Sequence, residues 1–443
     1  MSLSELQTRI ERQEAPLAVI GLGYVGLPVA CLFAEAGFAV MGVDIQAERV
    51  DKINAGVSPI EGDEPGLAGL LADVIAAGTL RATIDYKALA ACDVVILCVE
   101  TPVDEQHVPR YAALRAALRD LGPVLRAGAL VIIESTIAPG TMARVVQPLL
   151  EEASGKRAGD DFHLGHCPER VMPGKLLANL RGVSRVCGGE TPETADAMLA
   201  LYRHVVQADL DAADCVTAEL VKTAENAYRD VNIAFANEVA LICEAVGGDV
   251  WKVRELVNKS PGRAMLLPGA GVGGHCIPKD PWLLSYQARE QGVPVRLIPA
   301  ARAVNEGMPL HMIALLESAL AEADRELAGA RVLVLGYAYL ENSDDTRHSP
   351  SAVLVEALAA RGAEVVIHDP YVPSYQGDVL AMAQGCDAVV AMVKHGEYQS
   401  LDLGALQSAL RVPVLVDGRR VFAPGAGWIY RGVGEGILSQ ASR

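Results

Sequence analysis

The chain has 443 residues, more than one compact core usually contains, so we expect about two to four domains. Apolar residues make up 51% and charged residues 21% of the chain, a globular composition that excludes a largely disordered protein. The formal net charge of −17 repels phosphate backbones, which disfavours nucleic-acid binding and confines any anion site to a local pocket.

Neither a membrane span nor a signal peptide is predicted. No uninterrupted apolar run reaches the roughly 18–20 residues of a membrane helix. Residues 1–16 lack the apolar core of a signal peptide and are typical of a short polar helix or tail. The nine cysteines lack CxxC spacing, and most lie in apolar runs, as Cys31, Cys98 and Cys243 do. We therefore expect free thiols, a reducing cytoplasm and no membrane partner.

The first third of the chain alternates apolar and helical patterns. Short apolar runs occupy residues 17–23, 38–44, 93–102 and 129–136, and helical patterns occupy residues 25–36, 66–77 and 111–126. Runs that are apolar at every position are typical of parallel strands buried on both faces. The series predicts a doubly wound sheet.

The middle of the chain predicts one long helix over Ala212–Val246, because this alanine-rich stretch lacks proline and glycine. Such a helix is commonly a spine and often a subunit contact; the alternative is two helices with an unmarked break. Further on, apolar runs recur at 331–338, 363–370, 386–393 and 412–418, with a helical pattern at 350–360. We expect an α/β chain in which two Rossmann-like doubly wound domains, 1–211 and 326–443, are joined by a central helical domain, 212–325.

A Gly-Leu-Gly-Tyr-Val-Gly segment directly follows the first predicted strand and begins a helix. Gly21 permits the tight turn, Gly23 lets the backbone approach a pyrophosphate, and Gly26 lets helix and strand pack closely. Asp44 ends the next strand, where a carboxylate accepts ribose hydroxyl protons, and this acid favours NAD over NADP although Arg49 follows it. A plain tight turn is the alternative, and the placement of strand, helix and acid disfavours it.

Cys276 lies in the most unusual segment of the chain. It follows a loop with four glycines and is flanked by His275, Lys279 and Asp280. A glycine loop allows a ligand to approach closely, and neighbouring cations favour the reactive thiolate. The alternative is one more buried cysteine in a glycine turn, and the residues alone do not separate the two.

Polar residues also mark the long helix. Lys222, Asn226 and Arg229 have the i, i+4, i+7 spacing of one helix face. Such a stripe can line a cleft, whereas a solvated face is its commoner explanation. We expect no metal site at the two histidines and the cysteine within residues 163–167, because side chains that alternate along a short strand do not all face one ion.

Together, seven motifs in order resemble the UDP-glucose/GDP-mannose dehydrogenase family, over nearly the whole chain. They are GLGYVGLPVA (21–30), TPVDE (101–105), ESTIAPGT (134–141), CPERVMPG (167–174), VKTAENAYRDVNIAFANE (221–238), GVGGHCIPKDP (271–281) and DDTRHSP (344–350). The resemblance implies that the C6 alcohol of a nucleotide sugar is oxidised to a carboxylate while two NAD are reduced. It also implies an N-terminal NAD domain, a helical middle that forms a homodimer or larger assembly, and a C-terminal domain for the nucleotide.

The resemblance also implies roles for individual residues. Alcohol to acid is a four-electron change, and a thiol that captures the aldehyde retains it as a thiohemiacetal and then a thioester. The implied catalytic residues are Cys276 as nucleophile, Lys222 and Asn226 as donors to the oxyanion, Asp280 and Thr136 toward water, and Glu169 in thioester hydrolysis. The expected cofactor contacts are Gly21, Gly23, Tyr24, Val25, Gly26, Asp44, Arg49, Thr101, Thr136 and Arg347. The expected substrate contacts are Glu169, Arg170, Val171, Lys222, Asn226, Arg229, Gly273 and His275.

Two segments depart from the family pattern. Tyr339-Leu340 replaces the usual Phe-Lys, which removes a lysine expected near the nucleotide, and His348 replaces the glutamate of Arg-Glu-Ser-Pro. CPERVMPG, RDVNIAFANE and the histidine of GGHC most resemble family members that act on UDP-N-acetyl-D-mannosamine for surface polysaccharides. UDP-N-acetylglucosamine and UDP-glucose are the alternatives, because these sugars differ only in the orientation or identity of single groups. A non-catalytic NAD-binding regulatory protein would have lost the thiol or the lysine, and both are present.

Overall fold

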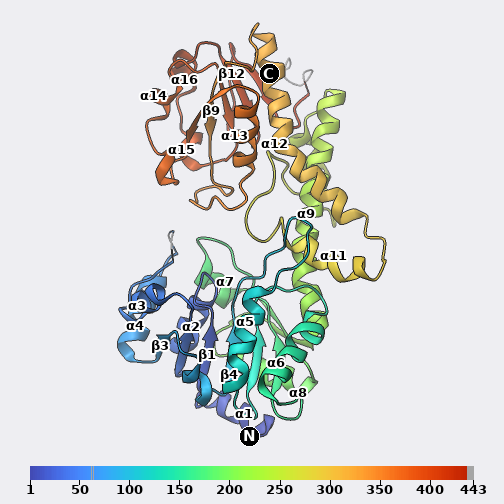
Figure 1. The fold of residues 1–443 in the computed structure, drawn as a ribbon. Coiled ribbons are helices and arrows are strands. Elements are labelled where there is room, and N and C mark those ends of the chain that lie inside the picture. The colour runs from blue at the N-terminus through green and yellow to red at the C-terminus, as the bar shows by residue number, and fades with distance from the viewer. Residues whose placement is uncertain (61, 63, 437–443) are drawn as a thin grey trace. The chain divides into compact units, whose positions relative to one another are not determined.

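The computed structural model describes residues 1–60, 62 and 64–436. The chain forms two compact units, each with one sheet (Figure 1). Unit 1 comprises Met1–Glu225 and Trp282–Val293, and unit 2 comprises Asn226–Pro281 and Pro294–Arg443. The division into three domains stays a prediction.

Unit 1 is built on an eight-stranded sheet in the order β3-β2-β1-β4-β5-β6-β7-β8. The strands are β1 (Leu17–Ile20), β2 (Val40–Val43), β3 (Leu80–Thr83), β4 (Val94–Leu97), β5 (Leu130–Ile133), β6 (His163–His166), β7 (Arg185–Gly189) and β8 (Leu210–Asp214). The helices are α1 (Leu3–Glu11), α2 (Gly26–Glu35), α3 (Ala47–Asn54), α4 (Leu67–Ala77), α5 (Ala112–Leu121), α6 (Gln147–Ser154), α7 (Leu176–Gly182), α8 (Pro192–Tyr202), the start of α9 (Cys215–Val246) and most of α11 (Asp280–Glu290). The first six strands are parallel and have the Rossmann order, and the direction reverses between β6 and β7.

Alternation of side chains explains the apolar strands of unit 1. Leu17 and Val19 of β1 pack into the core formed with α1, α2, α4, α7 and α8, whereas Ala18 and Ile20 pack into the core formed with α5 and α6. Successive side chains of a strand point to opposite faces, so a strand between two helix layers is apolar at every position. This burial accounts for the continuous apolar runs and confirms the doubly wound sheet.

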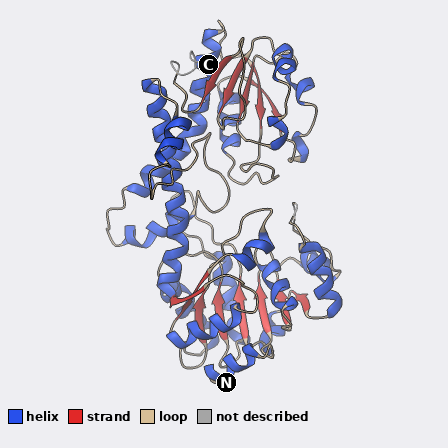
Figure 2. Ribbon diagram, turned by 180° about the vertical axis from the view of Figure 1, so that it is seen from behind, coloured by secondary structure: helices blue, strands red, loops and turns tan. Residues whose placement is uncertain are grey.

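Unit 2 contains a second, five-stranded parallel sheet in the order β10-β9-β11-β12-β13. Its strands are β9 (Arg331–Leu335), β10 (Glu364–His368), β11 (Ala388–Ala391), β12 (Val414–Asp417) and β13 (Ile429–Gly432). Its helices include the rest of α9, α10 (Val250–Val257), the start of α11 (Asp280–Glu290), α12 (Leu297–Glu322), α13 (Pro350–Ala360), α14 (Val379–Ala383), α15 (Gly396–Gln399) and α16 (Leu403–Ala409). Figure 2 shows the strands of each unit between helices.

The long helix α9 is continuous over 32 residues, which confirms the single-helix prediction and excludes the break. It begins at Cys215 and not at Ala212, because residues 210–214 form β8, which pairs with β7. The Asp214 carboxylate then accepts the backbone N–H of Thr217 at 2.8 Å, which caps the helix start.

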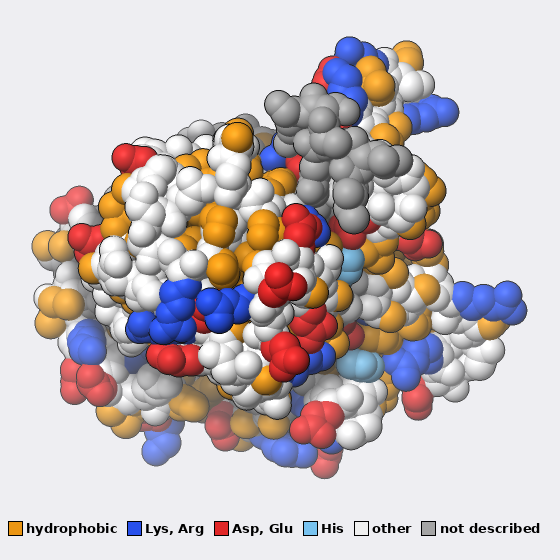
Figure 3. Space-filling view, turned by 90° about the horizontal axis from the view of Figure 1, so that it is seen from above, with side chains coloured by type: hydrophobic (Ala, Val, Ile, Leu, Met, Phe, Trp, Pro, Cys, Tyr) orange, Lys and Arg blue, Asp and Glu red, His pale blue; other side chains and the backbone are white. Residues whose placement is uncertain are grey.

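No helix within the described part of the chain has the length and apolarity that a membrane span requires. On the face drawn in Figure 3, lysine and arginine side chains lie among aspartates and glutamates.

Candidate active site

The glycine motif forms the turn between β1 and α2. Gly21 has a φ of +88°, a left-handed conformation that favours glycine, and a Cβ on Gly26 would lie 1.8 Å from the carbonyl oxygen of Gly21. A Cβ on Gly23 would meet no atom within 4 Å, so the backbone there is open to a ligand. The N-terminus of α2 follows at once and offers amides to an anion. This geometry fits the pyrophosphate of NAD.

Asp44 follows β2 and is 5% exposed. Its Oδ2 accepts the backbone N–H of Leu22 at 2.9 Å and pairs with Nη1 of Arg49 at 2.9 Å, while Oδ1 accepts the N–H of Gln46 at 2.9 Å. Each carboxylate oxygen has two lone pairs, so Oδ1 retains one for a ribose hydroxyl. Arg49 forms an ion pair with Asp44, so its presence after this aspartate does not by itself indicate a site for the 2′-phosphate of NADP.

Two threonines predicted at the cofactor lie together at the ends of β4 and β5. Thr101 is 3% exposed, and its Oγ1 donates to the carbonyl oxygen of Thr136 at 2.6 Å. The segment continues to Ala138, whose N–H donates to the Tyr111 hydroxyl at 2.9 Å. In parallel sheets of this type, ligands bind beyond the carboxyl ends of the strands, where this segment lies. Tyr24 of the glycine motif contacts Glu64 through its hydroxyl.

The CPERVMPG segment follows β6. Glu169 is 8% exposed, and its Oε2 accepts the N–H of Val171 at 2.6 Å. Arg170 donates from Nε and Nη2 to the two carboxylate oxygens of Glu225, at 2.8 and 2.5 Å, and from Nη1 to the carbonyl of Ser184. The guanidinium is thus bound to protein groups, and its contact with substrate stays a prediction.

The polar stripe of α9 is not a uniform solvated face. Lys222 is only 6% exposed, whereas Arg229 is exposed. Asn226, one helical turn after Lys222, donates from Nδ2 to Oδ2 of Asp280 at 2.6 Å. Asp280 is fully buried, and its Oδ1 lies 3.2 Å from Nζ of Lys279. Burial of an ammonium group is costly, so the position of Lys222 favours a functional role.

In unit 2, the Cys276 loop is held by its backbone. The carbonyl oxygen of Cys276 accepts the N–H of Lys279 at 3.1 Å and of Asp280 at 2.8 Å, and the N–H of Gly274 donates to the Arg347 carbonyl at 2.9 Å. A Cβ on Gly274 would lie 2.8 Å from the Tyr339 ring, and the residue has a φ of +90°. The glycine therefore allows the loop to pack against this ring, and the Cys276 side chain is half-buried.

Charged groups gather around this loop. Burial, with the charges of Lys279 and Arg347, lowers the pKa of His275 to about 4, so the imidazole is neutral at pH 7. Arg347 forms a two-point ion pair with Asp345, at 2.9 Å from Nε to Oδ1 and 2.5 Å from Nη2 to Oδ2. Cations near a thiol favour its nucleophilic form.

Two residues that sequence reasoning missed also hold the glycine loop. The Oδ1 of Asn237 accepts the N–H of Gly269 at 2.8 Å, and Nη2 of Arg419 donates to the Gly271 carbonyl at 2.7 Å. Within the described residues, no carboxylate lies within 4.0 Å of the Arg419 guanidinium, and burial lowers its pKa. Arg419 follows β12, and its position beyond the carboxyl end of a predicted strand was the signal that could have found it.

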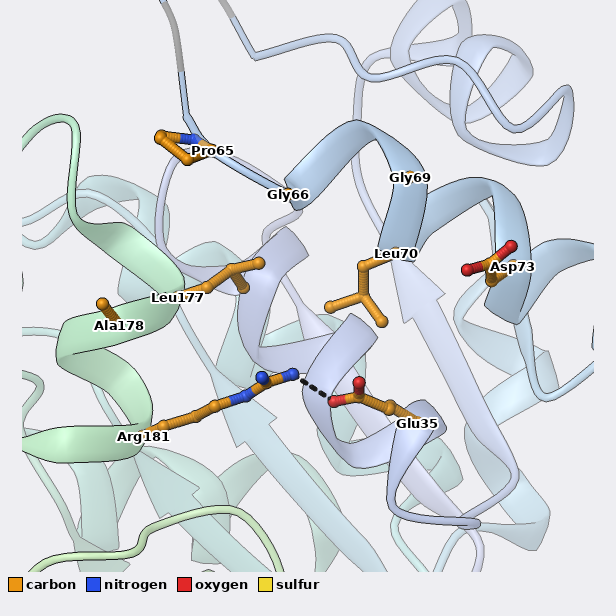
Figure 4. A pocket seen from close by; sticks show the side chains of 9 residues that line it. All are labelled: Glu35, Pro65, Gly66, Gly69, Leu70, Asp73, Leu177, Ala178 and Arg181. Carbon is orange, nitrogen blue, oxygen red and sulfur yellow. Dashed lines mark hydrogen bonds and ion pairs between the residues drawn. The ribbon is translucent and has the colours of Figure 1, made fainter.

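A cavity of about 520 Å³ lies elsewhere in unit 1. Figure 4 shows an ion pair between Glu35 and Arg181 beside it. The cavity is lined by Glu35, Pro65, Gly66, Gly69, Leu70, Asp73, Leu177, Ala178 and Arg181. None of these is a predicted site residue, so this cavity is separate from the candidate active site.

Within the described residues, no group of three or more His, Cys, Asp or Glu side chains is arranged to hold a metal ion. His163 lies against Glu190, with Nδ1 3.5 Å from Oε1, and Nδ1 of His166 lies 2.8 Å from the Ile133 carbonyl. All nine cysteines are free thiols, as expected.

The Rossmann-like unit, with its dinucleotide turn and the acid after β2, has the features of an NAD-binding dehydrogenase. Three models of the UDP-glucose/GDP-mannose dehydrogenase family match: the NAD binding domain at residues 15–206, the central domain at 216–307 and the UDP binding domain at 333–424. The chain belongs to this family, and the matched NAD binding domain confirms the predicted cofactor.

Similar proteins cover almost the whole chain. UDP-N-acetyl-D-mannosamine dehydrogenase of Pyrococcus horikoshii is 41% identical over 95% of this chain and 99% of its own, and a solved structure of that enzyme superposes with a TM-score of 0.90. The UDP-N-acetyl-D-mannosamine dehydrogenase of Escherichia coli K12 is 35% identical over 88% of this chain and 95% of its own. A structure of NDP-N-acetyl-D-galactosaminuronic acid dehydrogenase from Methanosarcina mazei has 36% identity, 99% coverage of both chains and a TM-score of 0.88.

Proposed function

We propose that the protein oxidises the C6 alcohol of UDP-N-acetyl-D-mannosamine to the carboxylate of UDP-N-acetyl-D-mannosaminuronate. The observation that carries this proposal is the buried Lys222, one turn from an Asn226 amide that is bound to Asp280, four residues after Cys276. The names of several relatives support this sugar. One relative is named for N-acetyl-D-galactosaminuronic acid, so the test must separate sugars that differ in the orientation of ring substituents. The alternative substrates are UDP-N-acetylglucosamine and UDP-glucose.

The proposed chemistry uses Cys276 as a covalent nucleophile. Two NAD molecules bound in turn would supply the hydride acceptors, one for oxidation of the C6 alcohol to the aldehyde and one for oxidation of the thiohemiacetal. The Cys276 sulfur adds to the C6 aldehyde, and its proton and the carbonyl electron pair give the hydroxyl of a thiohemiacetal. Lys222 and Asn226 donate to the oxygen that carries negative charge in this step. Oxidation of the thiohemiacetal gives a thioester, and attack of water releases the carboxylate and returns the thiol.

We propose that the buried carboxylates of Glu169 and Asp280 act in the attack of water on the thioester. Glu169 is nearly buried beside the β6 end, and Asp280 is held by Asn226 and Lys279. A carboxylate fixed in this way can accept the proton that water loses as it attacks the thioester. We propose that Asp280 and Thr136 orient the water and that Glu169 assists hydrolysis.

The nucleotide diphosphate is proposed to bind unit 2. Leu340 stands where the family usually has lysine, so another cation must meet the phosphates. Arg419 follows β12, and its guanidinium donates to backbone carbonyls of Gly271 and Met392 without a carboxylate partner in the described part of the chain. A phosphate is the natural partner of such a guanidinium.

NADH yield on a panel of UDP-sugars tests the proposed function. We expect two NADH per sugar and a kcat/KM for UDP-N-acetyl-D-mannosamine about 10-fold or more above that for UDP-glucose, because one substituent is worth roughly that much discrimination. A preference for UDP-glucose would overturn the sugar and keep the reaction. One NADH per sugar would overturn the four-electron chemistry, and none with any sugar would overturn the function.

We also propose that the protein is a homodimer through α9. Tyr228, Phe235, Ile242 and Val246 lie on one face of this helix and are 68%, 57%, 54% and 71% exposed. The first three are seven residues apart, so they form a straight apolar row of the kind that packs against a second copy.

Phe235→Glu should convert the dimer to monomer at micromolar concentration, because a two-fold axis would bring two buried carboxylates into one interface. Sedimentation velocity measures the change. Val353→Glu is the matched control, because Val353 is 45% exposed on α13, and it should leave the dimer intact. A monomeric wild-type protein, or a dimeric Phe235→Glu variant, would contradict the α9 interface.

The cellular setting is proposed from the same chemistry. Nine free thiols, one of them the proposed nucleophile, suit a reducing cytoplasm. A uronate product carries a new negative charge on an activated sugar, which suits the assembly of acidic surface polysaccharides.

A further inference from the structure

Glu219 is a buried carboxylate in the first turns of α9, where it binds the backbone of another segment. Its side chain is 1% exposed. Oε2 accepts the N–H of Gly140 at 2.6 Å, and Oε1 accepts the N–H of Met142 at 2.8 Å. The helical structure that leads into α6 begins at Met142, so these amides belong to a helix N-terminus, which favours a negative charge.

The segment that Glu219 binds also carries Thr136. At its start, the Thr136 carbonyl accepts from Thr101 at 2.6 Å. Farther along, the Ala138 N–H donates to the Tyr111 hydroxyl at 2.9 Å. These two bonds attach the segment to the loop after β4 and to the start of α5, and the Glu219 bonds attach its far end to α9.

Lys222 lies three residues after Glu219 on the same helix. One carboxylate therefore joins the segment that bears Thr136 to the helix that bears Lys222. Both oxygens of the carboxylate take part, so the contact fixes an orientation as well as a distance. A one-point contact would allow the segment to pivot.

Burial of the Glu219 carboxylate costs free energy, which its hydrogen bonds must offset. Burial raises its pKa to about 7, against the opposing effect of the Met142 and Gly140 amides. Within the described residues no lysine, arginine or histidine lies within 4.0 Å of this carboxylate. Burial without an ion pair is disfavoured unless the hydrogen bonds serve a definite arrangement.

We propose that Glu219 is a positioning residue that sets the distance between Thr136 and Lys222 during catalysis. The inference rests on the roles proposed above for those two residues. Glu219 acts through backbone amides and has no contact with the reacting groups.

Glu219→Gln tests the inference with little change in size. The glutamine oxygen accepts one amide, and its NH2 group faces the other amide N–H, so one contact is lost. We expect kcat to fall about 10- to 100-fold, because small misplacement of catalytic groups has effects of this size. KM for NAD and for the UDP-sugar should stay within about threefold, because both ligands bind through other residues.

Hydrogen exchange measures the contact itself. In Glu219→Gln, the amides of Gly140 and Met142 should exchange faster in a peptide covering residues 137–146, while the thermal midpoint stays near that of the wild type. Glu151→Gln is the matched control: the Glu151 carboxylate accepts the Ala158 N–H at 3.1 Å in the same unit and does not bind the Thr136 segment. It should keep the wild-type kcat.

An unchanged kcat in Glu219→Gln, with faster exchange of the two amides, would overturn the inference. Equal losses in kcat and in ligand binding, together with a lower thermal midpoint, would also overturn it, because they would indicate a general loss of structure. If the glutamine variant fails to fold, Glu219→Asp keeps the charge on a shorter side chain and should show an intermediate kcat with unchanged KM; a wild-type kcat in that variant overturns the inference. Full activity of Thr136→Ala and of a Lys222 variant would instead overturn the proposed roles on which the inference rests.

Discussion

Replacing Cys276 by serine should lower steady-state turnover by about a thousandfold or more and leave NAD and UDP-sugar binding largely unchanged. A serine hydroxyl is scarcely ionised at neutral pH, so capture of the aldehyde and formation of the acyl intermediate should fail or become very slow. The first hydride transfer needs only the alcohol, NAD and a base, so it should survive in part. Product analysis should therefore find aldehyde or a slowly hydrolysed ester.

The structure favours a clean test of this substitution. The loop is held by hydrogen bonds of the Cys276 carbonyl and the Gly274 N–H, so replacing the Cys276 side chain leaves these backbone bonds in place. Cys215→Ser is the control, because Cys215 is also half-buried and its thiol donates to the Gly188 carbonyl at 3.4 Å, a bond that serine can form. Two NADH per sugar at the wild-type rate from a folded Cys276→Ser protein would remove Cys276 as the nucleophile.

Lys222→Met should lower kcat by about 100- to 1000-fold, the usual effect of removing one donor to a developing oxyanion. Methionine has a similar length and suits a position that is 6% exposed, so the fold should be kept. Initial rates with varied UDP-sugar separate kcat from KM. Lys252→Met is the control, because Lys252 is an exposed residue of α10 paired with Glu255, and it should retain full activity. A rise in KM with unchanged kcat would make Lys222 a binding group only.

The sequence predicted the parts of the fold that have local signals. The turn at Gly21, the acid at Asp44 and the continuous α9 follow from patterns within a few residues of each other. Strand β8 was not predicted, because Leu210–Asp214 is a mostly exposed edge strand without an apolar run. The predicted helix start at Ala212 was therefore wrong by three residues. The reversal between β6 and β7 also has no local signal.

In the candidate site, too, most residues with a local signal in the sequence were predicted, and most contacts between distant segments were not. Helical spacing placed Lys222 and Asn226 on one face, and their roles were predicted from the family resemblance, because the spacing alone favoured a solvated face. The contacts of Arg419 and Glu219 join segments that are 148 and 79 positions apart in the sequence, so no window of the chain contains both partners. Asn237 had a local signal that was missed: it lies 11 residues, about three helical turns, after Asn226.

The continuity of α9 has a consequence for changes in chain length. Asn226 and Phe235 lie on the same helix, so their relative direction around its axis is set by the eight residues between them. Inserting one residue between them would rotate the apolar row by about 100° relative to the Asn226 amide. Where that row contacts a second copy, an insertion of about seven or eleven residues, close to two or three whole turns, would keep the proposed donor and the proposed subunit contact in phase.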